Sequence, residues 1–115
     1  MKDSRHVFRK ILDYIRKIQV YVKGVDYKSF ITNEEKIFAC AFAVCQISEL
    51  TQQISDAERK RYTAIPWPAI RALRNHIVHN YDKIDMQILW NTITVDLYEL
   101  AAEIEKIQKN TPKNV

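Results

Sequence analysis

Residues 4–24 read SRHVFRKILDYIRKIQVYVKG, and this stretch decides the class of fold. Its apolar residues recur at spacings of three and four, which is the period of one face of an α-helix. They are Val7, Ile11, Ile15, Ile18 and Val22. Gly24 is the only glycine in the chain and suits the left-handed conformation of a helix C-terminal cap. We therefore predict an amphipathic helix from Ser4 to about Lys23.

A second helix is predicted from Asn33 to about Ser55, after a connector over residues 25–32. Asn33 can cap its N-terminus, and Glu34 and Glu35 occupy the first turn, where the helix dipole favours negative charge. Apolar residues cover well over half of its circumference: Ile37, Phe38, Cys40, Ala41, Phe42, Val44, Cys45, Ile47, Leu50 and Ile54. A helix of this kind is buried on more than one side, either centrally in a bundle or partly at a subunit interface.

The second half of the chain predicts two further helices. The charged segment 56–62 and Pro66-Trp67-Pro68 predict a loop, after which Pro68 suits the first turn of a third helix that runs to the His79-Asn80 region. Residues 82–85 break the pattern, and Asp85 can cap a long last helix. Its apolar positions are Ile88, Leu89, Ile93, Val95, Leu97, Leu100, Ile104 and Ile107.

These four apolar faces pack most simply as an all-α, antiparallel up-and-down bundle of four main helices. A length of 115 residues suits one domain, which we place at 1–115. The polar tail from Asn110 to Val115 is expected to fray.

Charge and cysteine content narrow the class of protein. The balance of 18 basic against 14 acidic residues gives a net charge of +4, which permits an RNA partner but does not make a dense basic patch. Cys40 and Cys45 would point in different directions on a helix, so we predict two reduced thiols. No stretch has the composition of a signal segment or of a membrane span. We expect a cytoplasmic protein with no membrane partner.

Residues 74–81 read RNHIVHNY and hold polar side chains that an apolar bundle does not need. An arginine fork matches phosphate, and an imidazole can exchange a proton near neutral pH. Arg74 and His79 thus supply the parts needed for metal-independent RNA cleavage, in which the ribose 2′-OH attacks its own phosphodiester. Taken alone, an arginine and a histidine near each other are more often structural or surface residues. Positions five apart on a helix differ by about 140°. The two residues would converge if the helix ends or bends near His79, or they would meet across a dimer.

A metal-dependent site is not indicated. His76 and His79 are three residues apart, but no third and fourth ligand stand at zinc-like spacing. We therefore expect neither a metal nor another cofactor.

The run from Arg74 through His79 and Asn80 to Tyr81 resembles the Arg-x4-6-His-x-Tyr motif of HEPN ribonucleases, named for higher eukaryotes and prokaryotes nucleotide-binding domains. The flanking residues are similar to the HepT branch of this family, and the likeness covers nearly the whole chain. The similar segments are Ile47-Ser48-Glu49, Pro66-Trp67, Arg74-Asn75, Ile84-Asp85, Leu89-Trp90 and Asp96-Leu97. The chain departs from that branch at Ser48, where glycine is usual, and in the apolar character of its second helix.

The resemblance implies roles for particular residues. Arg74 and His79 match the catalytic pair, and Asn75 matches the polar residue that usually follows the arginine. Glu49 would be a supporting carboxylate that orients Arg74 or His79. Tyr81 matches the tyrosine that an MntA-type minimal nucleotidyltransferase antitoxin modifies with AMP. The added phosphate would repel or block an RNA phosphate.

The resemblance also implies the biological setting: a homodimeric endoribonuclease toxin of a type II/VII-like toxin–antitoxin module that acts on RNA such as tRNA or mRNA. A two-fold axis would set two Arg–His motifs facing one cleft. The alternative is a non-catalytic helical subunit that binds a nucleotide or substrate for a partner nucleotidyltransferase. A scaffold has no need of both Arg74 and His79, so the complete motif favours the enzyme.

Overall fold

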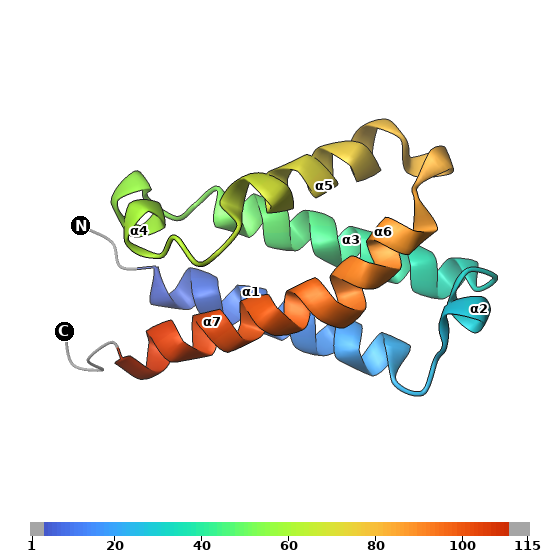
Figure 1. Ribbon diagram of the computed structural model, residues 1–115, viewed down its shortest axis with the longest axis horizontal. Helices are drawn as coiled ribbons and strands as arrows, with labels where there is room; N and C mark the ends of the chain where they lie inside the picture. The colour runs from blue at the N-terminus through green and yellow to red at the C-terminus, as the bar shows by residue number, and fades with distance from the viewer. Residues whose placement is uncertain (1–3, 111–115) are drawn as a thin grey trace.

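The computed structural model describes residues 4–110, and this part of the chain is built from helices alone (Figure 1). Its long helices run alternately up and down along the bundle. They are α1 (Arg5–Val22), α3 (Glu34–Thr51), α5 (Trp67–His79) and a last rod made of α6 (Met86–Asn91), η2 (Thr92–Asp96) and α7 (Leu97–Asn110). The predicted all-α bundle is confirmed. The predicted fraying covers Asn110 to Val115; Asn110 is the last residue of α7, and residues 111–115 lie outside the described part.

The core forms where α1 packs between α3 and α7. The predicted stripe of α1 is buried, because Val7, Ile11, Ile15 and Ile18 are each at most 2% exposed. Burying one such side chain stabilises the fold by about 1.5–3 kcal/mol. The helix ends as expected, since Gly24 has a φ of 71°, in the left-handed region that favours glycine.

The boundaries of α3 follow from its caps. Asn33 caps the helix as predicted, with its side-chain oxygen accepting a hydrogen bond from the Lys36 amide at 3.1 Å. The helix ends at Thr51 rather than near Ser55, because Ser55 caps the next helix by accepting a bond from the Glu58 amide. Only part of the broad apolar face of α3 is buried inside the bundle, since Phe38 and Phe42 are 50% and 61% exposed.

Two segments predicted as loops contain short helices, and those predictions were wrong. Residues 25–32 include α2 (Tyr27–Phe30), which Asp26 caps by accepting a bond from the Ser29 amide. Residues 56–62 include α4 (Asp56–Arg61). The reason in α4 is a capping pair of Ser and Glu three residues apart, followed by basic residues in the last turn, where the helix dipole favours them.

The second half begins and ends its helices where the sequence predicted. Pro68 stands in the first turn of α5, and the helix ends at His79. A single 3₁₀ turn, η1 (Tyr81–Lys83), follows. Asp85 then caps α6 by accepting bonds from the Gln87 and Ile88 amides at 3.0 and 3.2 Å.

The last rod contains a π-helical segment, η2, that the sequence did not predict. In this segment the hydroxyls of Thr92 and Thr94 donate to the carbonyl oxygens of Ile88 and Trp90 at 2.8 and 2.6 Å. A π segment is usually a single wide turn within an α-helix and often occurs beside a functional site. Here it turns Thr92 and Asp96 toward the space between the last rod and α5.

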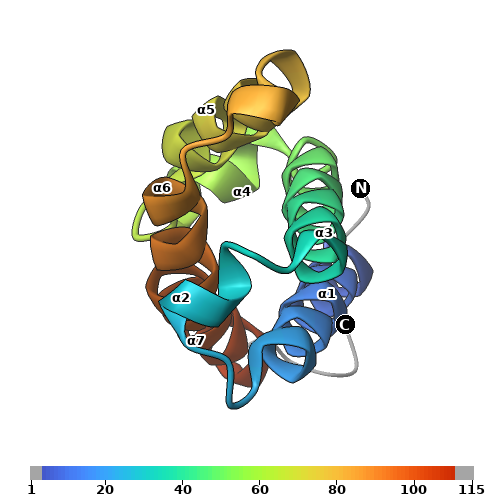
Figure 2. The same ribbon diagram turned by 90° about the vertical axis from the view of Figure 1, so that its right-hand side faces the viewer.

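The helix α5 lies on the outside of the bundle, against α3 (Figure 2). Only Ile77 of this helix is fully buried, whereas α1 buries seven residues. Its other sides therefore remain available for partners or substrates. No described helix has the length and apolar composition needed to cross a membrane.

Candidate active site

The structure pairs Arg74 of α5 with Glu49 of α3. The Nη2 atom of Arg74 lies 2.8 Å from Oε1 of Glu49, and the two side chains are 35% and 52% exposed. The Nη1 atom of Arg74 donates to Oδ1 of Asn75 at 3.1 Å. Glu49, Arg74 and Asn75 thus come together, and the guanidinium is fixed from two directions while it stays accessible to solvent.

A second contact between the same helices repeats this arrangement. The Nη2 atom of Arg71 donates to Oε1 of Gln52 at 2.7 Å. A step of three residues forward along α3, from Glu49 to Gln52, matches a step of three residues back along α5, from Arg74 to Arg71. That is the relation expected of two antiparallel helices in contact. Sequence reasoning missed Gln52, and only knowledge of the pairing register could have found it.

His79 is the last residue of α5 and is exposed. Within the described part of the chain, no hydrogen bond or ion pair joins it to Arg74. A single α-helix runs from Trp67 to His79, so the two residues keep different directions around the helix axis. Of the two arrangements that the sequence left open, convergence within one chain is therefore not what is observed.

The turn after α5 carries the third motif residue, Tyr81. The backbone of this residue begins η1, and its side chain lies outside the described part. His76 is tied to the same turn, because its Nε2 atom accepts a hydrogen bond from the Asp85 amide at 3.4 Å. His76 therefore helps to connect α5 with the start of the last rod.

Both cysteines are free thiols, as predicted, but their surroundings differ. Cys40 is buried, and this burial raises the pKa of its thiol to about 11. Cys45 is half-buried beside the Glu49 and Arg74 pair. Burial also raises the pKa of the Cys45 thiol, while Arg74 acts to lower it and Glu49 to raise it.

The described residues contain no cluster of three or more histidine, cysteine, aspartate or glutamate side chains placed to hold a metal ion. The functional groups of the candidate site are a guanidinium, a carboxylate and an imidazole. Such a set can bind a phosphate and move a proton.

Comparison with known proteins agrees with this set of groups. Residues 11–107 match the family model described as "Ribonuclease HepT-like". The chain belongs to the HepT-like ribonuclease family. The matched residues include the segment from Arg74 to Tyr81, and the match confirms the family resemblance found in the sequence.

Relatives within the HepT-like family span almost the same length. A protein of Methanocaldococcus jannaschii named as a putative RNase is 28% identical over 109 residues, which covers 95% of this chain and 94% of the relative. A protein of Thermococcus cleftensis named "Probable ribonuclease HepT" is 25% identical over 108 residues, covering 94% and 98%. No solved structure gives a significant match.

Proposed function

We propose that this HepT-like protein is a metal-independent endoribonuclease in which Arg74 and His79 act on the RNA backbone. The observation that carries the proposal is the state of Arg74: Glu49 and Asn75 hold its guanidinium in place, yet about a third of the side chain is exposed to solvent. A fixed guanidinium can bind a phosphodiester without first losing the freedom of a long side chain.

The proposed reaction takes its nucleophile from the substrate. His79, or its copy in a second subunit, removes the proton of a ribose 2′-OH or donates a proton to the leaving 5′ oxygen. The 2′ oxygen attacks the adjacent phosphorus, the bond to the 5′ oxygen breaks, and a 2′,3′-cyclic phosphate remains. Arg74 stabilises the negative charge that grows on the phosphoryl oxygens. A fully 2′-deoxy strand is therefore not cut.

The proposed active unit is a homodimer. Phe38, Phe42 and Val78 are large apolar residues that are 50%, 61% and 49% exposed. Phe38 and Phe42 share a helical stripe of α3 with Glu49, and Val78 shares a stripe of α5 with Arg74, four residues earlier. We call these three residues the apolar patch. Pairing of two apolar patches would bring the Arg74 of one subunit near the His79 of the other.

The proposed biological role is that of a toxin in a toxin–antitoxin module. An MntA-type nucleotidyltransferase would neutralise it by attaching AMP to Tyr81. Each added phosphate carries negative charge and would exclude an RNA phosphate by repulsion and by bulk.

The proposal is tested by incubating the wild-type protein and the His79→Ala variant with tRNA and total cellular RNA in the presence of EDTA. Intact mass is measured first, to establish that Tyr81 carries no adduct. We expect the wild type alone to cut and to leave cyclic phosphate ends. If neither unmodified protein cuts, the chain acts instead as a helical subunit that binds nucleotide or substrate for a partner enzyme. Cleavage of a fully 2′-deoxy oligonucleotide would contradict the proposed chemistry.

A further inference from the structure

A groove of about 770 Å³ lies between α5 and the last rod, with α3 beneath it. Its floor is apolar and includes Val44, Ile47, Leu97 and Leu100. The wall that α5 contributes carries the small residues Ala69 and Ala72, both exposed. Small side chains on one wall let another helix approach closely. The groove therefore has the shape and surface of a site for an amphipathic helix.

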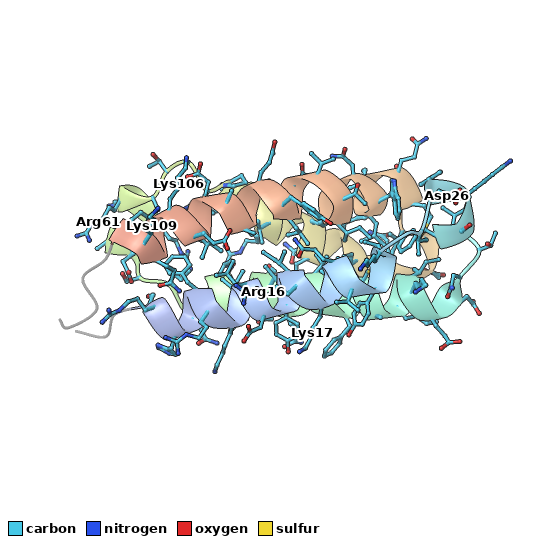
Figure 3. All side chains as sticks on the ribbon, turned by 90° about the horizontal axis from the view of Figure 1, so that it is seen from below. Arg16, Lys17, Asp26, Arg61, Lys106 and Lys109 are labelled. Atoms are coloured by element: carbon cyan, nitrogen blue, oxygen red, sulfur yellow. The ribbon has the colours of Figure 1, made fainter. Side chains whose placement is uncertain are left out.

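The opposite wall of the groove is acidic. Asp96, Glu99 and Glu103 line it at spacings of three and four along η2 and α7. Lys106 lies 3.3 Å from Glu103 and offsets part of the charge. The chain as a whole carries a net charge of +4, so this carboxylate row differs locally from the rest of the molecule. Other basic side chains lie away from the groove, for example Arg16 and Lys17 along α1 (Figure 3).

We propose that this groove docks an amphipathic helix of a partner protein, whose apolar stripe enters the groove and whose flanking lysine or arginine residues pair with Asp96, Glu99 and Glu103. Complementary charge selects such a partner and sets the direction in which its helix lies. The same carboxylates repel the phosphates of RNA, so the groove is not part of an RNA path.

A second copy of this chain fits the groove poorly. Val95 and Tyr98, which are exposed, stand next to Asp96 and Glu99, and would bring carboxylates toward carboxylates. The basic outer face of α1 exposes, among the described residues, a single large apolar side chain, Val20. A helix in a groove needs apolar anchors on successive turns. The face of α3 that exposes Phe38 and Phe42 also carries Glu34 and Glu49, so it too would bring carboxylates toward the carboxylate row. Arg74, which stands beside Val78, cannot offset this repulsion, because its guanidinium is already paired with Glu49.

The groove and the candidate active site lie on different sides of α5. Ala69, Ala72 and His76 line the groove, whereas Arg74 contacts α3 through Glu49. A docked helix would leave Arg74 open and would lie beside the turn to which His76 is bonded through Asp85. That position suits a partner that modifies Tyr81. The modification of Tyr81 rests on the proposed function, whereas the docking of a helix in the groove does not.

The test uses two synthetic helical peptides of about 18 residues, or about five turns. Both carry the same leucine stripe and a fluorescent label, and they differ only in having lysine or glutamate on the flanks. Fluorescence anisotropy at physiological salt measures their affinity for the full chain. We expect the lysine peptide to bind the wild type at least about tenfold more tightly than the glutamate peptide.

Variants locate the binding and separate it from nonspecific attraction. The double change Glu99→Lys with Glu103→Lys should weaken the lysine peptide by about tenfold and strengthen the glutamate peptide. Ala72→Trp should block both peptides by filling the groove. The control Glu105→Lys also replaces a glutamate of α7 with lysine, but Glu105 is exposed and lies outside the groove. This change should leave the affinities for both peptides within about twofold of the wild-type values.

Two results would overturn the proposal. One is binding of both peptides alike to every variant. The other is a wild-type dimer that Ala72→Trp converts to a monomer, because a second copy would then occupy the groove. RNA cleavage by the same proteins reports separately on the proposed function: an inactive wild type that still selects the lysine peptide would remove the ribonuclease and keep the docking site.

Discussion

Arg74 owes its position to a residue that stands 25 places earlier in the chain. The pairing with Glu49 crosses from α5 to α3, so the guanidinium is placed by how the two helices pack as well as by its own helix. The pair is accessible to solvent, and an exposed pair contributes at most about 1 kcal/mol to stability. We therefore expect the ion pair to position Arg74 and to contribute little to the free energy of folding.

The change Glu49→Gln tests that expectation. It removes the charge that holds Arg74 while keeping the size of the side chain. We predict that kcat for RNA cleavage falls by about tenfold because the guanidinium is less well placed, while the free energy of unfolding changes by less than about 1 kcal/mol. Single-turnover kinetics and urea unfolding measure the two quantities.

The matched control for this prediction is Asp13→Asn. Asp13 pairs with Arg16 at 3.3 Å on the exposed face of α1, so the change breaks an ion pair of similar exposure far from the motif. It should leave both kcat and stability unaltered. A Glu49→Gln protein that cuts RNA faster than the wild type would show instead that Glu49 restrains Arg74.

The candidate site was predictable from the sequence only in part. Arg74, Asn75 and His79 follow one another in a single helix, so a motif could point to them. Glu49 was predicted from the family resemblance as a carboxylate that orients Arg74 or His79. Its contact with Arg74 agrees with that prediction, and its role in catalysis is still a prediction. Gln52 and the setting of Cys45 depend on the register between α3 and α5, which no local pattern contains.

At the scale of helices, the capping residues set most boundaries. Asn33, Gly24 and Asp85 end or begin their helices as predicted, because each effect is local to one turn. The helix α4 was missed because the high charge of its segment was given more weight than the capping pair of Ser55 and Glu58. The π segment was missed because its cause lies in packing over the whole rod and not in a short pattern.

The cap at Asp85 gives a prediction at this scale. Asp85→Ala removes the acceptor of two amide hydrogen bonds at the start of α6. We expect a loss of about 1 kcal/mol in the free energy of unfolding and a fall of about 4 °C in Tm. Urea and thermal unfolding followed by circular dichroism measure both.

Asp82→Ala is the matched control for the cap. Asp82 is an exposed aspartate in η1, three residues earlier, and is not the cap of a helix. Its change should stay within about 0.5 kcal/mol. Equal losses in the two variants would mean that the negative charge of this turn matters, and not the cap of α6.

For the molecule as a whole, the bundle exposes two different surfaces along α5. The apolar patch of Phe38, Phe42 and Val78 lies on the helical stripes that carry Glu49 and Arg74, while the groove with its carboxylate row lies on another side of α5. We propose the first surface for a second copy and the second for a basic partner. Because the two surfaces are separate, the proposed dimer would still be able to bind that partner.

The proposed homodimer makes a prediction about Phe42. Its side chain is 61% exposed, so Phe42→Ser removes little buried area from the single bundle. We expect the dimer dissociation constant to rise by at least about tenfold, with RNA cleavage lost in parallel. Analytical ultracentrifugation at micromolar concentration measures the first quantity.

Val20→Ser supplies the control for this prediction. Val20 is 72% exposed on α1, a helix that contributes no residue to the apolar patch, and the change likewise puts serine in place of an apolar helical residue. This variant should remain dimeric. If Phe42→Ser is dimeric too, the contact between subunits lies elsewhere on the bundle.

Among the long helices, α5, which carries Arg74 and His79, is the least anchored in the core, because Ile77 is its single buried residue. Local opening of a helix costs less free energy when fewer buried contacts must break. The amide protons of α5 should consequently exchange with deuterium sooner than those of α1. Binding of a second subunit, of RNA or of a docked helix would then slow that exchange, so each ligand could be detected by the protection that it gives to the same thirteen-residue helix.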